Sequence, residues 1–422
     1  MNPLNPGLPR PSRIWLVAVF ALWCTDLALA AVPLPPEDAL GRSVAAAPET
    51  RAARSRLLQA RSEARLSALG PYEWTLSGAG VKRDIEGEGR FNEWDTALER
   101  PVRLPGKAAL DRELGKLMIV RAAAELQVVE RTTRLAILDA WFACVGAAER
   151  AQLLEQDRSY MQGVYDAVAI RRRGGDLAEL DEALASAELA TANAGTTAAR
   201  MQAADAARAL ATRLDVTSCA VESWDAPPET TVGTASLGVT ADDGVAADPA
   251  VRVSAAIAEL ASVGAERTRR DRWPDPTLAA TYGRERGGVE RLGGLSISVP
   301  LGVRRRAAEI AKAEAAAAVA AAEHDTARAN SRREWLARSA ALRRSHEVWL
   351  ALAAAEAHQR RAADLTRHAF ELGELSLAES LIVRRVALQA RVAEREAALA
   401  AWHALAIDAA YRATVGGEIS AP

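Results

Sequence analysis

Histidine is the side chain of this 422-residue chain best suited to acid–base or metal chemistry, and five are present. They are His324, His346, His358, His368 and His403. No two lie four residues apart, the helical spacing that brings two imidazoles onto one metal ion. His346-Glu347 begins like a zinc-protease motif, but its fifth position is Leu350. We therefore predict surface or interhelical positions for the histidines, with a metal site as the alternative.

Other catalytic patterns are missing from the sequence. It contains no G-x-G-x-x-G, no P-loop and no G-x-S-x-G nucleophile elbow. Acidic pairs such as Asp181-Glu182 are typical of solvated helix faces. The 53 basic and 55 acidic residues nearly cancel, so the net charge of −2 gives no support for a nucleic-acid partner. The sequence predicts neither an enzyme nor a cofactor.

The composition and the prolines indicate long helices. Alanine, the best helix former, occurs 96 times, whereas aromatic residues make up only 5%. No proline occurs in 106–226 or in 301–421, and each gap is 121 residues long. Because proline breaks helix interiors, these gaps are where long helices can run. Their equal length predicts a tandem repeat of about 200 residues.

Each repeat is predicted to contain a helix, a strand pair and a long helical hairpin. The first repeat spans 31–214, with a helix at 48–69, strands at 72–80 and 91–102 around a loop at 81–90, and a hairpin at 107–214. The second spans 249–415, with a helix at 249–272, strands at 277–282 and 292–299 around a loop at 283–291, and a hairpin at 304–415. Gly174-Gly175 and Gly373 are predicted to turn the hairpins. The aperiodic segment 215–248 is predicted to be a linker, and 416–422 a C-terminal tail.

The first 30 residues resemble a secretory signal peptide. Arg10 and Arg13 precede an apolar run at 14–24, and the segment ends in the small-x-small pattern Ala28-Leu29-Ala30. Lipidation at Cys24 is an alternative. Two cysteines remain, and hairpin pairing places Cys219 about 22 Å from Cys144 along the helix axis at 1.5 Å per residue. We therefore predict no disulfide between them.

The predicted strands suggest a membrane role for several copies of the chain. Residues 296–299 alternate polar and apolar, the period of a strand with two unlike faces. Four strands cannot close a membrane barrel, because the smallest have about eight. Two copies would supply eight strands and three would supply twelve. An ordinary soluble hairpin is the alternative.

In the order and spacing of these parts, the sequence resembles the TolC-like outer-membrane efflux proteins. The strongest stretch is Leu295-Ser296-Ile297-Ser298-Val299-Pro300-Leu301 followed by Arg305-Arg306-Ala307-Ala308-Glu309-Ile310, and a second is Phe370-Glu371-Leu372-Gly373-Glu374-Leu375-Ser376. The Pro105-Gly106-Lys107 junction resembles the heavy-metal efflux branch of this family. The resemblance implies a mainly α fold with a small β part. Long antiparallel hairpins form an α-barrel, and each chain adds four strands to a shared transmembrane β-barrel.

The resemblance also implies a location, partners and a docking site. A homotrimer in outer-membrane lipid would reach through the periplasm to an adaptor protein and an inner-membrane pump of the RND type or similar. The hairpin turns would form the adaptor-docking tip, comprising Arg171, Arg172, Arg173, Gly174, Gly175, Asp176, Leu177, Gly373, Glu374, Leu375 and Ser376. A solvated helix end is the alternative for the three arginines. A periplasmic coiled-coil or adaptor-like protein without a membrane barrel is the alternative function.

Overall fold

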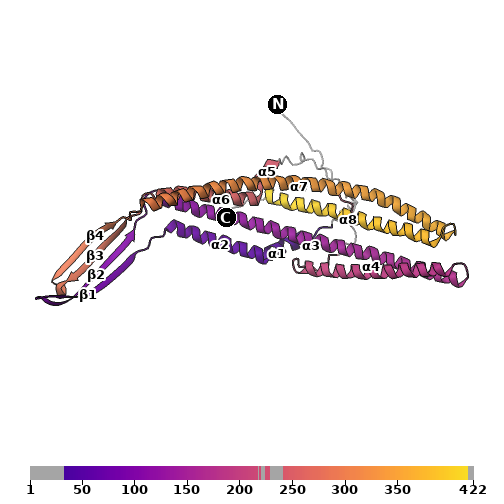
Figure 1. The fold of residues 1–422 in the computed structure, drawn as a ribbon, viewed down its shortest axis with the longest axis horizontal. Coiled ribbons are helices and arrows are strands. Elements are labelled where there is room, and N and C mark those ends of the chain that lie inside the picture. Colours follow the sequence, from indigo (N-terminus) through magenta and orange to yellow (C-terminus); the bar gives the residue numbers. More distant parts are fainter. Residues whose placement is uncertain (1–32, 217, 220–223, 229–240, 417–422) are drawn as a thin grey trace, which may run out of the picture.

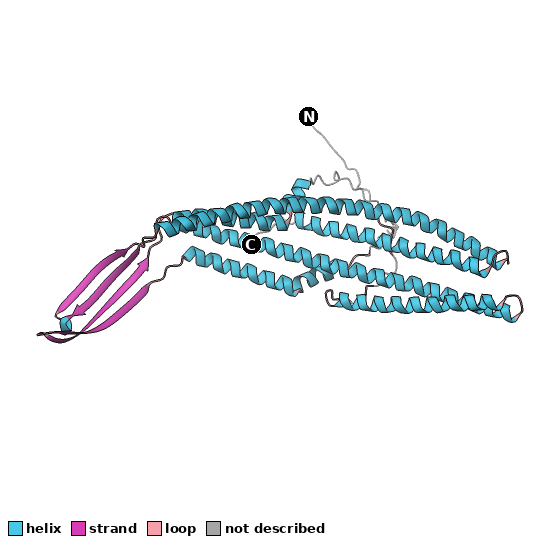
Figure 2. Cartoon of the chain, in the orientation of Figure 1, coloured by secondary structure: helices cyan, strands magenta, loops and turns pink. Residues whose placement is uncertain are grey.

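The chain is long and narrow, with a small sheet at one end and two helical hairpins at the other (Figures 1 and 2). The computed structural model describes residues 33–216, 218–219, 224–228 and 241–416. The predicted signal peptide at 1–30, with Cys24, lies outside the described residues, as do residues 417–422 of the predicted tail. No helix of the described part is both long enough and apolar enough to cross a membrane.

Two series of elements follow the same order. The first comprises α1 (Glu37–Ala46), α2 (Pro48–Leu69), β1 (Thr75–Ile85), β2 (Gly89–Pro101), α3 (Lys107–Arg173) and α4 (Glu179–Ala211). The second comprises α5 (Ala241–Ala247), α6 (Pro249–Arg270), β3 (Thr277–Glu285), the short 3₁₀ turn η1 (Arg286–Gly288), β4 (Glu290–Ser298), α7 (Val303–Glu371) and α8 (Leu377–Gly416). The mainly α fold with tandem repeats and four strands is therefore confirmed.

The long helices α3 and α7 are the frame on which the shorter helices pack. At 67 and 69 residues, each is about 100 Å long at 1.5 Å per residue. α2 and α4 pack against α3, and α6 and α8 pack against α7. Proline opens both α2 and α6 at the first helical turn, where its missing N–H has no helical partner to lose. Each long helix therefore connects the sheet to a hairpin turn.

The sheet is antiparallel in the order β1-β2-β3-β4, so it joins the two repeats through β2 and β3. Its strands are longer than the sequence predicted, since β1 continues to Ile85 and β2 begins at Gly89. The expected loop at 81–90 is therefore mostly strand. The expected loop at 283–291 is likewise shortened, because β3 continues to Glu285 and β4 begins at Glu290. Charged residues there continue the ladder past the apolar segment, and Gly87, with φ 84°, makes the tight turn.

The main core lies midway along the helices. It gathers apolar side chains of α1, α3, α4 and α8, including Leu138, Phe142 and Val145 of α3 with Leu399 and Trp402 of α8. A second, smaller core near the turns joins Met161 and Val168 of α3 to Leu377 and Leu381 of α8. The two hairpins are therefore packed together at two levels.

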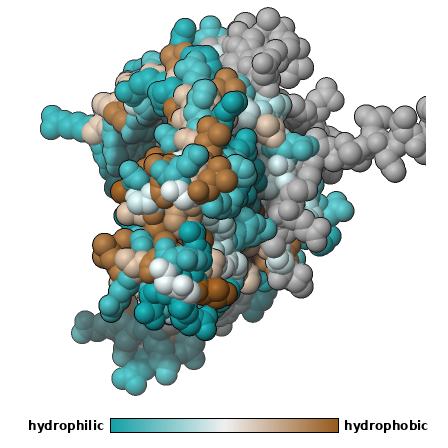
Figure 3. All heavy atoms as spheres, turned by 90° about the vertical axis from the view of Figure 1, so that its right-hand side faces the viewer, coloured by the Kyte–Doolittle hydropathy of each residue, from teal (hydrophilic) through white to brown (hydrophobic). Residues whose placement is uncertain are grey.

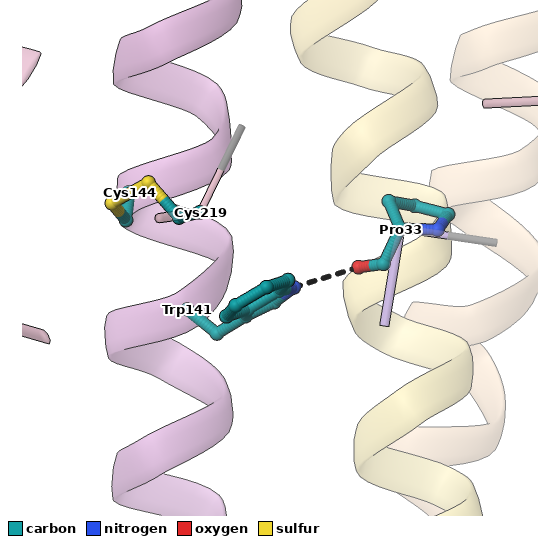
Figure 4. The surroundings of a disulfide bond; sticks show 4 residues. All are labelled: Pro33, Trp141, Cys144 and Cys219. Carbon is teal, nitrogen blue, oxygen red and sulfur yellow. Dashed lines mark hydrogen bonds between the residues drawn. A yellow bond between two sulfur atoms is a disulfide. The ribbon is translucent and has the colours of Figure 1, made fainter. Parts of the chain in front are cut away.

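A disulfide between Cys144 and Cys219 corrects the sequence prediction that these residues are too far apart. Their Cα atoms are 6.0 Å apart. The prediction assumed that the helix of the second hairpin arm continues in a straight line to residue 219. Instead, α4 ends at Ala211 and the chain turns there, with Leu214 almost fully buried. Nearby, Trp141 Nε1 donates to the Pro33 carbonyl at 2.9 Å (Figure 4). The turn brings the chain back along α3 and closes the bond.

The predicted linker at 215–248 is docked wherever the structure describes it. Trp224 is buried in the main core beneath the Arg395 guanidinium, which lies 3.7 Å from its ring centroid. Trp402 Nε1 donates to the Asp225 carbonyl at 3.0 Å. The last seven residues before Asp248 form α5. The described parts of this segment therefore belong to the packed body of the protein.

Removing the disulfide is expected to destabilise the fold. The bond closes a loop with a sequence separation of 75, so a Cys144→Ala/Cys219→Ala variant should lose about 2–4 kcal/mol of unfolding free energy. The measurement is the urea midpoint in detergent, compared between oxidised wild type, reduced wild type and the double variant. A midpoint unchanged by either the reduction or the double substitution would contradict the expectation.

Candidate functional site

One face of the sheet is covered by exposed apolar side chains. Residues directly opposite in the ladders share a face, so the register places even-numbered residues of β1–β3 together with odd-numbered residues of β4. The large apolar members of this apolar face are Leu76, Trp94, Leu98, Leu278, Tyr282, Leu295 and Ile297, all of them exposed. No part of the chain that the structure describes packs over these side chains, and an exposed apolar surface of this kind is typical of one that meets a membrane or another protein.

The opposite face of the sheet is polar over most of its length. It carries Thr75, Ser77, Glu93, Asp95, Glu99, Thr277, Thr281, Ser296 and Ser298. Large apolar side chains join it near the turns, where Val81, Ile85, Phe91 and Leu292 lie. Alternation of this kind is typical of a strand with lipid on one side and water on the other.

Aromatic residues bound the apolar face at both ends. Trp94 and Tyr282 pack at the turn end, with ring centroids 5.9 Å apart. At the helix end Trp74 is exposed, with the Arg100 guanidinium 5.3 Å from its ring centroid. Gly80 lies opposite Trp94, so the two aromatic levels are about 20 Å apart at 3.3–3.4 Å per residue. With the strand tilt of about 35–45° that outer-membrane barrels have, this length spans about 15 Å of an apolar band about 25 Å tall, and aromatic girdles are typical of both edges of that band.

A buried ionic cluster joins the two repeats where the sheet meets the helices. Lys107, the first residue of α3, is 1% exposed. Its Nζ donates to the Trp273 carbonyl at 2.7 Å and to Asp275 Oδ1 at 3.0 Å, and lies 2.9 Å from Asp271 Oδ1. The other oxygen of Asp275 accepts from the Tyr72 hydroxyl at 2.6 Å. One lysine of the first repeat is thus held by three residues that follow α6 in the second.

The contacts in this cluster shift the pKa of the Asp275 carboxyl and of the Tyr72 phenol in opposite directions. Burial opposes ionisation of Asp275, but hydrogen bonds from Tyr72, from the Leu104 N–H and from Lys107 lower the pKa of that carboxyl overall. Burial, and then the hydrogen bond to Asp275, raise the pKa of Tyr72 to about 12. The phenol therefore stays neutral and continues to donate at any physiological pH.

Tyr72→Phe tests this linkage. The raised pKa means that the folded state favours the neutral Tyr72 phenol. The stability that the neutral phenol contributes is therefore complete below pH 10 and is lost as the pH rises towards 12. We expect wild-type unfolding temperature to fall across this window more steeply than that of Tyr72→Phe. Equal slopes in a thermal melt series from pH 9 to pH 12 would contradict the assignment.

Sequence reasoning missed the role of Lys107 within the cluster. The available signal was its rarity, because only four of the 53 basic residues are lysines. The other three, Lys82, Lys116 and Lys312, are exposed. Lys107 directly follows the glycine that begins α3, in a chain whose other basic residues are nearly all arginine. Such a lysine indicates a position that favours a compact ammonium with three donors over a planar guanidinium.

The predicted tip residues lie together at the end of the molecule farthest from the sheet (Figure 1). Both turns have the same geometry. The Asp176 N–H donates to the Arg171 carbonyl at 2.9 Å, and the Glu374 N–H donates to the Ala369 carbonyl at 2.9 Å. Gly175 and Gly373 adopt the left-handed conformation that ends a helix, with φ of 85° and 78°. Ser376 and Glu379 then form a capping box that begins α8.

The three tip arginines differ in their surroundings. Arg171 is half-buried, with its guanidinium 5.7 Å from the Phe370 ring centroid of the other hairpin. Arg172 pairs with Glu182 of α4. Arg173 is exposed, and its Nε donates to the Ala169 carbonyl of its own helix at 3.1 Å. Arg173 therefore presents its charge most openly, whereas the other two also hold the hairpins in place.

Apolar side chains and a groove accompany these charges at the tip. Leu180, Leu372 and Ile170 are exposed there. Seen from this end, apolar residues lie scattered among hydrophilic ones (Figure 3). Between the hairpins runs a groove of about 490 Å³, whose lining includes Tyr160, Val164, Arg171, Phe370, Leu377 and Arg384. Adaptor docking at this end stays a prediction.

The histidines are dispersed along α7 and α8. His346 is buried beside Trp349, and His403 lies 2.8 Å from Asp139 Oδ1. His324 Nδ1 lies 3.0 Å from the Ser254 hydroxyl. Within the described ranges, no group of three or more His, Cys, Asp or Glu side chains is arranged to hold a metal ion.

Solved structures share this architecture. The outer-membrane channel OprN matches with a TM-score of 0.77 and 19% identity over 90% of each chain. The open-state MtrE channel of Neisseria gonorrhoeae matches with a TM-score of 0.71 and 17% identity over 92% of this chain and 93% of that one. VceC of Vibrio cholerae matches with a TM-score of 0.70 and 15% identity over 91% and 96%. The chain therefore has the fold of outer-membrane channels.

Comparison by sequence gives a different result. No family model matches the chain, and no curated protein matches it significantly. The likeness therefore lies in the arrangement of helices and strands.

Proposed function

We propose that the chain is one protomer of an outer-membrane channel that carries solutes out of the cell in a tripartite efflux system. The observation that carries the proposal is the apolar face, bounded by aromatic residues about 20 Å apart at 3.3–3.4 Å per residue and backed by a polar face. The helical body would extend into the periplasm for about 100 Å from the sheet. The fold shared with solved outer-membrane channels supports this reading.

The sheet edges argue for several copies. β1 and β4 are the outer strands of the sheet, so each has one edge without a strand partner among the described residues. Within lipid, unpaired backbone groups cost several kcal/mol each, so the edges must meet strands of neighbouring chains. We infer a trimer in which twelve strands close a barrel whose wall presents the apolar face outward and the polar face to the lumen.

Fractionation tests this function. Wild-type protein should be found in the outer-membrane fraction, as an oligomer that survives unheated gel electrophoresis and dissociates on boiling. A monomer confined to the soluble periplasmic fraction would instead favour the coiled-coil or adaptor-like alternative.

At the other end, the tip is proposed to dock a periplasmic adaptor that connects the channel to an inner-membrane pump. Its support is the meeting of both hairpin turns, the open charge of Arg173, the exposed leucines and the groove between the hairpins. A partner with acidic and apolar side chains would fit this mixture.

Reversing the tip charge is expected to weaken docking. Arg171→Glu/Arg172→Glu/Arg173→Glu should reduce adaptor cross-linking by about tenfold, because three exposed or partly exposed charge contacts contribute up to about 1 kcal/mol each. Arg51→Glu/Arg56→Glu/Arg61→Glu on α2 is the matched control, since those arginines are exposed but far from the tip. Oligomer mobility should stay unchanged in both. Undiminished cross-linking in the tip variant would remove the docking claim.

The exported substrate is proposed to be a heavy metal. The support is the resemblance of the Pro105-Gly106-Lys107 junction to the heavy-metal efflux branch. Growth of a deletion strain on divalent metal salts, compared with growth on cationic dyes, tests this choice. Sensitivity to dyes alone would argue for a drug pump.

A further inference from the structure

Three basic side chains form a row along the turn end of the apolar face. They are Lys82 of β1, Arg284 of β3 and Arg291 of β4, and we call them the basic row. The register places all three on the apolar face, because Arg284 lies opposite both Trp94 and Arg291, and Lys82 follows Gly80 by two residues. All three are exposed. The basic row therefore begins level with Trp94 and reaches two residues beyond it at Lys82.

Within the described residues, these cations have no acidic partner. The nearest acid on the same face is Asp84, and it already pairs with Arg90 at 2.9 Å. Glu285 and Glu290 flank the row but lie on the opposite face of their strands. Arg284 and Arg291 face each other directly across the β3–β4 ladder, and like charges in that position destabilise a sheet. An anion bound between them would relieve the repulsion.

The height of the row indicates which anion fits. Arg284 and Arg291 are level with Trp94, and Lys82 lies two residues further, so the basic row lies about 20–27 Å from Trp74 along the strands at 3.3–3.4 Å per residue. Aromatic girdles mark the two interfaces of outer-membrane strands, so a row that begins level with Trp94 lies at the rim of the apolar layer. A lipid whose acyl chains lie against Leu295 and Tyr282 would bring its phosphate to the basic row. Guanidinium groups bind phosphate oxygens in a bidentate manner, and lysine adds a point charge.

We propose that the basic row binds the phosphate headgroup of an anionic lipid in the membrane leaflet at the turn end of the sheet. This inference rests on the proposed function, because it takes the apolar face to be in contact with lipid. It goes further by assigning a specific headgroup chemistry to one rim of that face. Binding is expected to weaken with salt, since exposed charges are screened.

The test uses full-length protein extracted from the outer membrane in neutral detergent and washed free of lipid. Bis-phosphorylated lipid A is titrated in, and bound phosphorus per chain is measured. Each cation near a membrane surface strengthens anionic binding about fivefold, so Lys82→Gln/Arg284→Gln/Arg291→Gln should bind about a hundredfold more weakly. Arg51→Gln/Arg56→Gln/Arg61→Gln on α2 removes the same charge elsewhere and should bind like wild type.

Three results would overturn the proposal: equal affinity of wild type and the triple variant, equal retention of zwitterionic phosphatidylcholine, or full displacement of lipid A by millimolar inorganic phosphate. The last result would mean that the row holds free phosphate. If the triple variant fails to assemble, Lys82→Gln alone should show the fivefold loss. Absence of wild type from the outer membrane would defeat the proposed function itself, before any lipid is added.

Discussion

A Leu295→Arg variant is expected to fail to accumulate in the outer membrane. Leu295 lies near the middle of β4 on the apolar face and is 89% exposed in the single chain. Arginine at the centre of a lipid-facing strand costs about 2–4 kcal/mol, and a trimer would carry this penalty three times. We expect the amount of assembled oligomer to fall at least about tenfold, measured by immunoblot of outer-membrane fractions without boiling.

The neighbouring residue provides a matched control. Ser296 is the next position along β4 and lies on the polar face, opposite Ala279. Ser296→Arg introduces the same side chain into the same strand, but towards the proposed lumen, where water can solvate it. Normal accumulation of Ser296→Arg together with loss of Leu295→Arg would support the assignment of faces. Equal accumulation of both variants would contradict a lipid contact on the apolar face.

A Lys107→Met variant is expected to be the most destabilising single substitution at the junction between sheet and helices. Methionine has a similar length but leaves the Asp275 carboxylate and the Trp273 carbonyl without the ammonium that each contacts. Removing one partner of a buried ion pair typically costs about 3–5 kcal/mol. The measurement is the urea midpoint of the detergent-solubilised protein, followed by circular dichroism.

Lys116→Met separates this effect from the general loss of a lysine. Lys116 is an exposed residue nine positions further along α3, and its ion pair among the described residues is with Glu113 at 3.2 Å. Such a surface pair contributes about 0–1 kcal/mol, so its loss should barely move the midpoint. If Lys107→Met proved as mild as Lys116→Met, the buried cluster would have no structural role.

Much of the architecture could be predicted from proline and glycine alone. The gap between Pro105 and Pro227 predicted α3, whose bounds Lys107 and Arg173 match the expected helix. Gly175 and Gly373 could be assigned to turns because only glycine readily takes the left-handed conformation that ends these helices. Alternation at 296–299 likewise predicted which residues of β4 share a face. These signals are local, so the sequence carries them directly.

The features that were missed depend on where the chain goes after a helix ends. The position of Cys219 beside Cys144 follows from the turn after Ala211, which no single residue type announces. The Lys107 cluster joins residues more than 160 positions apart, which the pairing of β2 with β3 and the packing of α3 against α6 bring together. The basic row required the register of three ladders. Long-range contacts of this kind are a property of the folded chain and leave little trace in local sequence.

The native mass of the protein, extracted from the outer-membrane fraction in mild neutral detergent, is the decisive measurement for a shared barrel. We expect the fraction to contain the protein with a mass three times that of the mature chain, because the outer edges of β1 and β4 require neighbouring copies. A soluble periplasmic protein with the mass of a single chain would contradict it.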